Sequence, residues 1–234
     1  VEATGTAPLR YQWKKGAAPI DGATNSSYTT PATSLADSGT EYSVDVSNDL
    51  GTVTSSTANL TVNARYSQIV NNSGVFYPKT ECVKDNSTGL VWEGKPTTGT
   101  RAASNTYTNY DSTTSAQKQG VIFGTYVNPT QGEIDASTNS IGYVSAVNSG
   151  SGVCGYTDWR LPTKDELAGI FANSGSPRID TTWFPNTQAN YYWSSSPYVG
   201  NSYTAWGINF RYGNVNGNYR ENDYAVRLVR GTSQ

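Results

Sequence analysis

The sequence of 234 residues contains no histidine, and this absence excludes more chemistry than any other feature. Without histidine there is no Ser-His-Asp or Cys-His nucleophile system, and no zinc or iron site with imidazole ligands. Methionine is also absent, and charged residues make up only 15%, against about 25% in average globular proteins. The composition favours a binding module over an enzyme, and we expect no metal or other cofactor.

Strong charge and long apolar runs are lacking as well. Lys and Arg number 16 against 18 Asp and Glu, which leaves no excess of cations for binding nucleic acid or an anionic membrane. No apolar run reaches the roughly 20 residues that a transmembrane helix needs, so we expect no direct membrane insertion. Because the chain starts at Val1 and not at Met, we expect it to be part of a longer polypeptide.

Only two cysteines occur, Cys82 and Cys154, and they lie far apart in the sequence. Their spacing is not that of a zinc site, and two thiolates alone would leave such a site half built. A reactive thiol is the less favoured alternative. The favoured interpretation is a disulfide in an exported protein, which would stabilise the fold by roughly 4 kcal/mol in the chain-entropy model.

Residues 1–64 show short stretches of β-strand pattern separated by turns, with apolar and polar residues alternating around Tyr42 and Val44. This spacing predicts an all-β sandwich. Trp13 resembles the buried tryptophan of an immunoglobulin-like domain and Tyr42 resembles its tyrosine corner, whereas Val44 stands where that family has its second cysteine. The resemblance implies an incomplete sandwich without a disulfide, and we expect it to act as a spacer.

Residues 65–234 form the second predicted domain, of the α+β class with two helices and long loops. One helix is predicted at 138–148 from its apolar periodicity. Its apolar face would consist of Ile141, Val144 and Val147. Thr163 and Glu166 form a capping box, which predicts the start of the second helix. Between these helices and the first motif we expect loops with short strands, one of them at 120–124.

Several motifs of the second domain are distinctive together. They are 85–92 (DNSTGLVW), 155–163 (GYTDWRLPT), 192–196 (YWSSS), 205–210 (AWGINF) and 226–231 (VRLVRG). Their order resembles the C-terminal domain of the Legionella collagen-like adhesin, over nearly all of 75–231. The resemblance implies a C-type lectin-like fold, related to the formylglycine-generating enzyme scaffold.

Structural roles are expected for the large side chains within these motifs. They are four tryptophans, Trp92, Trp159, Trp193 and Trp206, and three arginines, Arg160, Arg227 and Arg230. The calcium-binding triplets of sugar-binding C-type lectins do not occur, which disfavours calcium-dependent binding. Asp165 and Glu166 are adjacent carboxylates, but the start of a helix explains them.

Tyr, Asn, Gly and Ser make up more than half of the residues from 198 to 224, a composition typical of antibody paratopes. The strand period predicts Trp206, Ile208 and Phe210 on the inner face, with Gly207, Asn209 and Arg211 facing outward. The pattern resembles the variable region of proteins diversified by diversity-generating retroelements. The ligand-binding residues that this resemblance implies are Tyr198, Asn201, Ser202, Tyr203, Gly207, Arg211, Tyr212, Asn216, Asn218, Tyr219, Asn222, Asp223 and Tyr224.

The leading hypothesis is therefore a non-enzymatic recognition protein that binds a protein or other surface ligand of a host or partner cell. We expect an extracellular, cell-surface or virion-surface location. The alternative is an undiversified adhesin module that binds polysaccharide or sulfated glycan without calcium, through residues such as Arg211 and Arg220. Alanine at Tyr212, Tyr219 and Tyr224 is expected to abolish ligand binding and to leave the melting temperature nearly unchanged.

Overall fold

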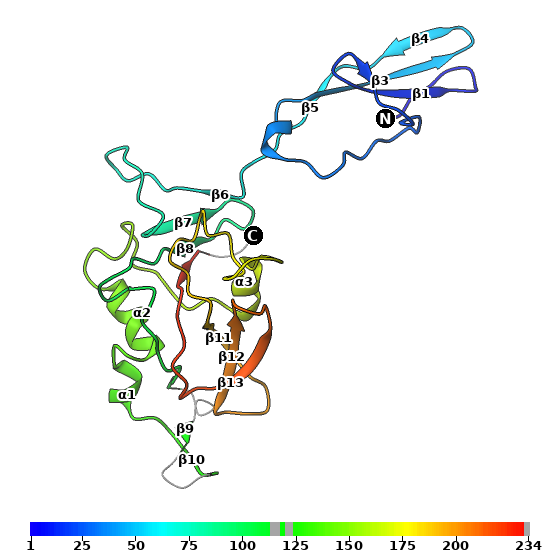
Figure 1. Ribbon diagram of the computed structural model, residues 1–234. Coiled ribbons are helices and arrows are strands. Elements are labelled where there is room, and N and C mark those ends of the chain that lie inside the picture. Colours follow the sequence, from blue (N-terminus) through cyan, green and yellow to red (C-terminus); the bar gives the residue numbers. More distant parts are fainter. Residues whose placement is uncertain (113–117, 120–123, 232–234) are drawn as a thin grey trace. The chain divides into compact units, whose positions relative to one another are not determined.

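The computed structural model describes residues 1–112, 118–119 and 124–231, and the chain divides into two compact units. Unit 1 is Val1–Ala64 and unit 2 is Arg65–Gln234 (Figure 1). Antiparallel sheets dominate the regular structure of both units, and helices are few. The predicted mixture of many strands with few helices is thus confirmed at this coarse level, and each unit is described by itself.

Unit 1, described throughout its length, contains a single antiparallel sheet with the strand order β2-β1-β3-β4, and β5 pairs with the start of β3. The strands are β1 (Arg10–Lys15), β2 (Ala18–Pro19), β3 (Glu41–Asn48), β4 (Gly51–Thr54) and β5 (Ala58–Asn59), with a short 3-10 helix, η1, at Leu35–Asp37. Trp13 pairs with Val44 across β1 and β3. Val44 is buried but Trp13 is only half-buried, because no second sheet covers it. The two-layered sandwich is therefore not confirmed.

Unit 2 contains two larger sheets and one pair of short strands. The first sheet has the order β14-β8-β7-β6, and joins the two ends of the unit. Its strands are β6 (Tyr66–Ser67), β7 (Cys82–Asp85), β8 (Val91–Glu93) and β14 (Val229–Arg230). The second sheet runs β11 (Tyr191–Pro197), β12 (Thr204–Asn209) and β13 (Val215–Tyr219) in order. The short pair is β9 (Lys118–Gln119) with β10 (Tyr126–Val127).

Three helices lie in the described part of unit 2, where the sequence predicts two. They are α1 (Gln131–Asp135), α2 (Ser140–Asn148) and α3 (Lys164–Gly169). The capping box at α3 is confirmed, because the Glu166 backbone N–H donates to Thr163 Oγ1 at 3.2 Å and the Thr163 N–H donates to the Glu166 carboxylate at 2.8 Å. A second capping box, from Thr130 to Glu133, starts α1.

The buried face of α2 differs from the predicted one. Ile141 is 37% exposed, whereas Tyr143 and Val147 are buried. The Tyr143 ring packs 4.5 Å from that of Tyr107, and its hydroxyl donates to the buried carboxylate of Glu93. The larger ring thus takes a core position in place of Ile141, whereas Val147 is buried and Val144 packs half-buried against the core, as predicted. The strand predicted at 120–124 lies outside the described residues, apart from Gly124.

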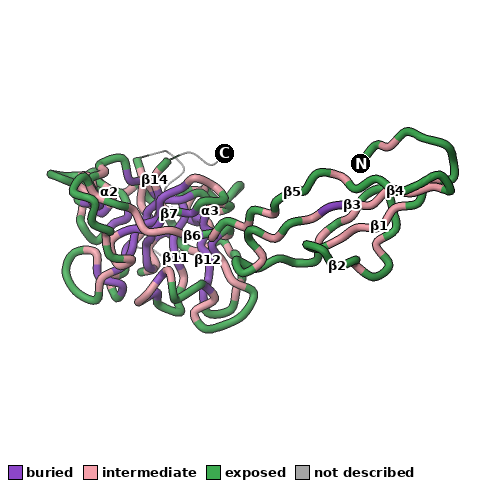
Figure 2. Tube along the Cα trace, turned by 90° about the horizontal axis from the view of Figure 1, so that it is seen from above, coloured by how far each residue is buried: buried purple, intermediate pink, exposed green. Residues whose placement is uncertain are grey.

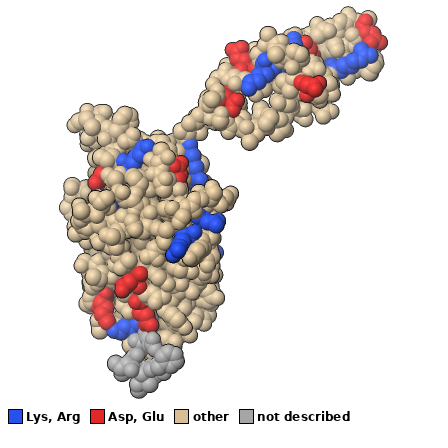
Figure 3. Space-filling view, in the orientation of Figure 1, with Lys and Arg blue, Asp and Glu red and all other residues tan. Residues whose placement is uncertain are grey.

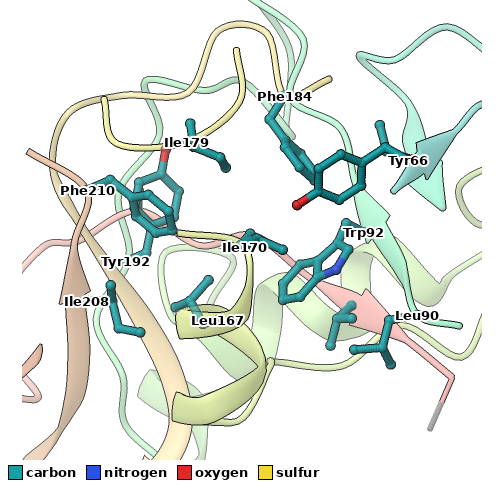
Figure 4. Close-up of a cluster of buried hydrophobic side chains, with 13 residues drawn as sticks. Tyr66, Leu90, Trp92, Leu167, Ile170, Ile179, Phe184, Tyr192, Ile208 and Phe210 are labelled. Carbon is teal, nitrogen blue, oxygen red and sulfur yellow. The ribbon is translucent and has the colours of Figure 1, made fainter. Parts of the chain in front are cut away.

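The core of unit 2 consists of two hydrophobic clusters, one on each face of β11 and β12. Because neighbouring residues of a strand point to opposite faces, Tyr192 belongs to one cluster and Trp193 to the other. The first cluster also contains Trp92 and Phe210 (Figure 4), and the purple segments of Figure 2 trace the buried chain of this unit. Both faces of the β11–β12 pair are therefore anchored.

The second cluster contains the predicted disulfide. Cys82 and Cys154 are bonded, with an S–S distance of 1.97 Å, and both lie in this cluster beside the fully buried Trp159. This bond ties β7 to the loop that follows α2. The prediction of a disulfide is confirmed.

Charged side chains complete the interior. Lys95 Nζ forms an ion pair with Glu93 Oε2 at 3.0 Å, and burial lowers the pKa of Lys95 to about 8. Arg227, also buried, donates to the backbone carbonyl of Glu93 at 2.5 Å. Nearer the surface, Arg160 pairs with Glu166 at 2.6 Å and holds the pKa of that carboxyl below its ordinary value. Two further bonds, from Arg230 to the Asp158 carboxylate, confirm the structural role predicted for the arginines.

Candidate functional site

The predicted site residues lie on β12, β13 and the loops at their ends, all in unit 2. In the strand register, Gly207 lies between Trp193 and Asn216, and Trp206 lies opposite Gly217. Residues 198–203 form the loop between β11 and β12, and residues 220–224 follow β13. The side chains fall into three groups, and each group includes at least one residue that was not among those predicted.

The first group, here called the asparagine–tyrosine cluster, consists of Tyr191, Asn216, Asn218, Asn222 and Tyr224. Asn216 donates to the Tyr191 hydroxyl at 3.1 Å, and the Tyr224 hydroxyl donates to Asn218 Oδ1 at 3.2 Å. Asn222 donates to the Tyr224 hydroxyl at 3.1 Å, and the rings of Tyr191 and Tyr224 stack 4.8 Å apart. These side chains hold one another in fixed positions, so the cluster is ordered before any ligand arrives.

The same cluster is fastened to the core through Tyr224. Its ring lies 4.8 Å from the fully buried ring of Trp193, and burial raises the pKa of its hydroxyl. Tyr224 is half-buried and packs against the second hydrophobic cluster. Because a core contact would be lost, the structure favours a lower melting temperature for alanine at this position over the unchanged one expected from the sequence.

The period-2 pattern of β12 holds only in part. Ile208 and Phe210 are buried as predicted, but Trp206 is half-buried. Gly207, predicted to face outward, is buried beneath the asparagine–tyrosine cluster, where a Cβ would lie 3.0 Å from Asn218 Nδ2. Asn209, also predicted to face outward, is 7% exposed, because its Oδ1 accepts hydrogen bonds from the backbone N–H groups of the next turn. Both faces of β12 are covered near its centre.

The second group, here called the Tyr198 platform, consists of Tyr198, Trp206, Lys164 and Gly217. The rings of Tyr198 and Trp206 lie 4.7 Å apart, and Lys164 Nζ lies 5.2 Å from the Trp206 ring. Gly217 makes the arrangement possible, because a Cβ there would lie 2.4 Å from the Tyr198 ring. The ring therefore packs directly over Gly217, and any residue with a Cβ at this position would require a shift.

The third group, here called the tyrosine stack, consists of Tyr126, Tyr203 and Tyr219. Tyr203 stacks on Tyr126 at 3.6 Å and on Tyr219 at 5.7 Å. A side-chain hydrogen bond with Tyr203 raises the pKa of Tyr126 to about 12, so this phenol stays neutral at physiological pH. Tyr219 is 51% exposed and presents its ring to solvent.

Other predicted residues stand at the edges of these groups. Tyr212 is 61% exposed, with the guanidinium of Arg211 5.1 Å from its ring, and Asp223 is exposed. Asn201 and Ser202 are half-buried in the loop before β12. The predicted residues thus lie along the β12–β13 hairpin and its adjoining loops, with Tyr219 near one end of the hairpin and Arg211 and Tyr212 in the turn at the other.

Arg220 has a different role from that of a surface cation. It is 3% exposed, and its Nε and Nη1 donate to the backbone carbonyls of Ser202 and Asn109 at 3.1 and 2.9 Å. Burial lowers the pKa of its guanidinium, which Asp111 partly offsets. The residue therefore ties two loops together, and it cannot lie on a cationic surface for sulfated polymers.

Within the described ranges, no group of three or more His, Cys, Asp or Glu side chains is placed to hold a metal ion. The helices of the described part are too short or too polar to cross a membrane.

Comparison with known proteins identifies the family. The model of the Lcl C-terminal domain matches residues 81–230, well over half of the chain. The chain belongs to the Lcl C-terminal domain family. Neither a curated protein nor a solved structure shows a significant match. Family membership indicates an adhesin-like, ligand-binding module, and such a module is consistent with surface exposure.

The matched range of this Lcl C-terminal domain includes every residue of the three groups. The sequence alone does not place five members of these groups in the site: Tyr126, Lys164, Tyr191, Trp206 and Gly217. Trp206 was interpreted as a core residue, since a tryptophan among small residues has a large face to bury. Tyr126 lies in β10, far from Tyr203 in the sequence, and only the tertiary fold brings the two rings together. The sequence does carry a signal for Tyr191, because this residue immediately precedes two core aromatic residues in the same strand.

Proposed function

We propose that this Lcl C-terminal domain is a non-enzymatic recognition module that binds a protein or other surface ligand of a host or partner cell. The binding face would be formed by the three aromatic groups on β11, β12, β13 and their loops. The observation that carries the proposal is the placement of the exposed Tyr219 on a stack of tyrosine rings, together with a second exposed ring, that of Tyr212, in the turn between β12 and β13. Tyrosine offers a large amphipathic contact area with few rotatable bonds.

The fixed geometry of the support favours affinity. Each flexible side chain that a ligand immobilises costs about 0.5–1.5 kcal/mol of conformational entropy. In the asparagine–tyrosine cluster this cost is already met within the folded protein, by the bonds of Asn216 to Tyr191 and of Tyr224 to Asn218. A ligand that docks on the cluster would therefore lose less of its interaction energy to ordering.

The finer proposal is that this chain is the target of a diversity-generating retroelement. In support, the exposed residues Arg211, Tyr212, Tyr219 and Asp223 can be exchanged without disturbing the two core clusters. The test is the neighbouring DNA: we expect a near-copy of the codons for about 191–231 beside a reverse transcriptase gene. Differences between the copies should fall on exposed positions and spare buried ones such as Gly207. An isolated gene without such a copy would make this an undiversified family member.

The role of unit 1 as an immunoglobulin-like spacer, and a location on a cell or virion surface, belong to the same proposal. The strand pairing of Trp13 with Val44 supports the first. The disulfide supports the second, because such bonds persist mainly in oxidising compartments.

A glycan ligand is the second candidate, and the Tyr198 platform favours it, because flat aromatic surfaces can pack on sugar rings. A sulfated polymer is less favoured. Arg220 is buried and therefore not available to a sulfate group. Burial, together with the negative charges of Glu221 and Glu133, raises the pKa of Tyr110 to about 12, and such negative charges would repel a sulfated polymer. Figure 3 shows that uncharged residues cover most of the visible face of unit 2.

The test uses the full chain against immobilised probes: mucin, fibronectin and collagen as proteins, and mannan, heparin and dextran sulfate as polysaccharides. We expect binding to one or more proteins, and loss of that binding in the double variant Tyr212→Ala/Tyr219→Ala. The matched control is Leu50→Ala/Val53→Ala, which removes two large exposed side chains from unit 1. Binding confined to dextran sulfate and heparin that disappears at high salt would favour the glycan alternative. Equal binding by both double variants would exclude the proposed face.

A further inference from the structure

The strand β13 is the end strand of the β11-β12-β13 sheet, and its outer edge is open (Figure 1). Other sheet edges of unit 2 are covered. At β11, Trp193 N–H donates to the Ala225 carbonyl at 2.9 Å, and Ala225 N–H donates to the Tyr191 carbonyl at 3.0 Å. At β14, the backbone groups of Arg160 and Val229 exchange two hydrogen bonds of 2.9 Å. No segment of the described chain pairs with β13 on the side away from β12.

The hydrogen bonds at the two ends of the β12–β13 pair show which residues of β13 face β12. Asn209 N–H donates to the Asn214 carbonyl at 3.0 Å, and Arg220 N–H donates to the Tyr203 carbonyl at 2.9 Å. Successive residues of an antiparallel strand direct their backbone N–H and C=O groups to opposite sides. The even-numbered residues from 214 to 220 therefore bond to β12, and the odd-numbered ones face outward.

Three residues of β13, Val215, Gly217 and Tyr219, thus direct their backbone groups to the open edge. Among the described residues, one of these groups has a hydrogen-bond partner, because the Tyr219 carbonyl accepts from the Asn222 N–H at 3.0 Å. The side chains of Val215 and Tyr219 are 37% and 51% exposed. The edge therefore offers both unpaired backbone groups and apolar side-chain surface.

The edge also lacks the features that normally keep an end strand from pairing with another chain. Natural proteins protect such edges with charged side chains, proline or a bulge. The sequence of β13, VNGNY, contains neither a charged residue nor proline, and its pairing with β12 shows no register shift. This strand is therefore suited to an interface.

The sequence of β13 is nearly symmetric about Gly217. If a second copy pairs antiparallel across a two-fold axis at Gly217, Asn216 faces the partner's Asn218. Val215 then faces the partner's Tyr219, and a β-branched residue opposite an aromatic one is a favourable cross-strand pair. The strand is thus complementary to itself in this orientation.

The charges at the two ends of the strand are complementary in the same orientation. Arg211 lies six residues before Gly217, and Asp223 lies six residues after it. Both side chains are exposed, and neither forms an ion pair within the described part of the chain. The two-fold axis brings each Arg211 to the end at which the partner has Asp223, whereas a parallel pairing in register would bring like charges together.

We propose that the outer edge of β13 binds a second copy of this chain, in an antiparallel pairing centred on Gly217. Each Gly217 N–H donates to the carbonyl of the partner's Gly217, and each Tyr219 N–H donates to the carbonyl of the partner's Val215. The two β11-β12-β13 sheets then form one continuous sheet, with both Tyr219 side chains on the same face. This dimer goes beyond the proposed recognition function, and it would place two binding faces side by side.

The test is sedimentation equilibrium of the full chain without any ligand, from about 10 μM to about 1 mM, the range in which weak dimers dissociate. We expect a monomer–dimer equilibrium, because an edge of five residues forms a small interface and such interfaces are transient.

A charge exchange tests the orientation of the pairing. Arg211→Glu places like charges together at both ends of the interface and should weaken the dimer about tenfold. The double variant Arg211→Glu/Asp223→Arg restores opposite charges and should return the dissociation constant close to that of the wild type. The matched control is Lys84→Glu, which makes the same change of charge at an exposed position of β7 and should leave the dimer unchanged.

A proline tests the pairing of the backbone. Val215→Pro removes an outward N–H and places a ring at the open edge, but it leaves the hydrogen bonds to β12 intact, because proline is tolerated at the first residue of an edge strand. We expect the dimer to weaken by about tenfold or more. Val215→Thr is the control, since it keeps both the shape and the N–H. If Val215→Pro has a lower melting temperature than wild type, the charge exchange decides alone.

Three results would each overturn the proposal. They are a monomer throughout the concentration range, a double charge variant that dimerises as weakly as Arg211→Glu, and a dimer that neither Arg211→Glu nor Val215→Pro weakens. The third result would be expected of a dimer formed through β4, the exposed end strand of unit 1. Because no ligand is present, a failure here leaves the proposed recognition function standing, and loss of that function leaves the dimer standing.

Discussion

Replacing Tyr224 with alanine tests whether the binding face is built on the core. The substitution removes a ring that stacks on Tyr191 and packs at a tilt against Trp193, each at 4.8 Å, and a hydroxyl with two hydrogen-bond partners. Replacing a fully buried aromatic ring with alanine costs about 3–5 kcal/mol of unfolding free energy. Because this ring is half-buried, we predict a loss of about 2 kcal/mol. For a domain of this size that corresponds to a melting temperature lower by about 4–8 °C.

Differential scanning calorimetry of the full chain measures this change in the transition of unit 2. The matched control is Tyr212→Ala, which removes a ring that is 61% exposed and should change the stability by no more than about 0.5 kcal/mol. Tyr224→Phe keeps the stack and should cost only about 0.5–1.5 kcal/mol for its lost hydrogen bonds. A melting temperature for Tyr224→Ala equal to that of Tyr212→Ala would refute the claim that Tyr224 belongs to the support.

Three further results are expected. Reducing the disulfide should lower the unfolding free energy of unit 2 by roughly 4 kcal/mol, measured by urea denaturation with and without reductant; an unchanged midpoint would contradict its structural role. Glu166→Gln should lower the melting temperature at pH 7, and its difference from wild type should shrink as the pH falls below 4.5. The reason is that the hydrogen bond from Arg160 lowers the pKa of the folded carboxyl, so the stabilisation is lost when this carboxyl is protonated. A difference in melting temperature that grows toward low pH would be inconsistent with this sign. Gly217→Ala should displace the Tyr198 ring with little loss of stability. NMR spectra should then lose the contacts between the rings of Tyr198 and Trp206, and persistence of those contacts would count against the platform.

The features that the sequence predicts correctly depend on local signals. The capping box of Thr163 and Glu166 needs only four consecutive residues, and it starts α3 where expected. The disulfide follows because only two cysteines occur in the whole chain. The burial of Ile208 in β12, and of Phe210 directly after it, follows from the strand period. In each case the deciding interaction lies within the element itself or has a single possible partner.

The features that the sequence missed depend on contacts between distant segments. Ile141 loses the buried face of α2 to Tyr143, because Glu93 and Tyr107 from other parts of the chain bind that ring. Asn209 is buried because a turn needs its side-chain oxygen. Composition alone located the tyrosine- and asparagine-rich region, but it could not separate the side chains that form the support from those that remain exposed.

Hydrogen–deuterium exchange of the full chain, with and without the protein probe that it binds on the panel, tests the central claim most directly. If the three aromatic groups form the recognition face, binding should slow exchange in the segments 198–204 and 211–224 and leave 1–64 unchanged. The same segments should show no added protection in Tyr212→Ala/Tyr219→Ala mixed with the probe. Protection confined to unit 1, or to the surface around α3 away from β13, would contradict the claim.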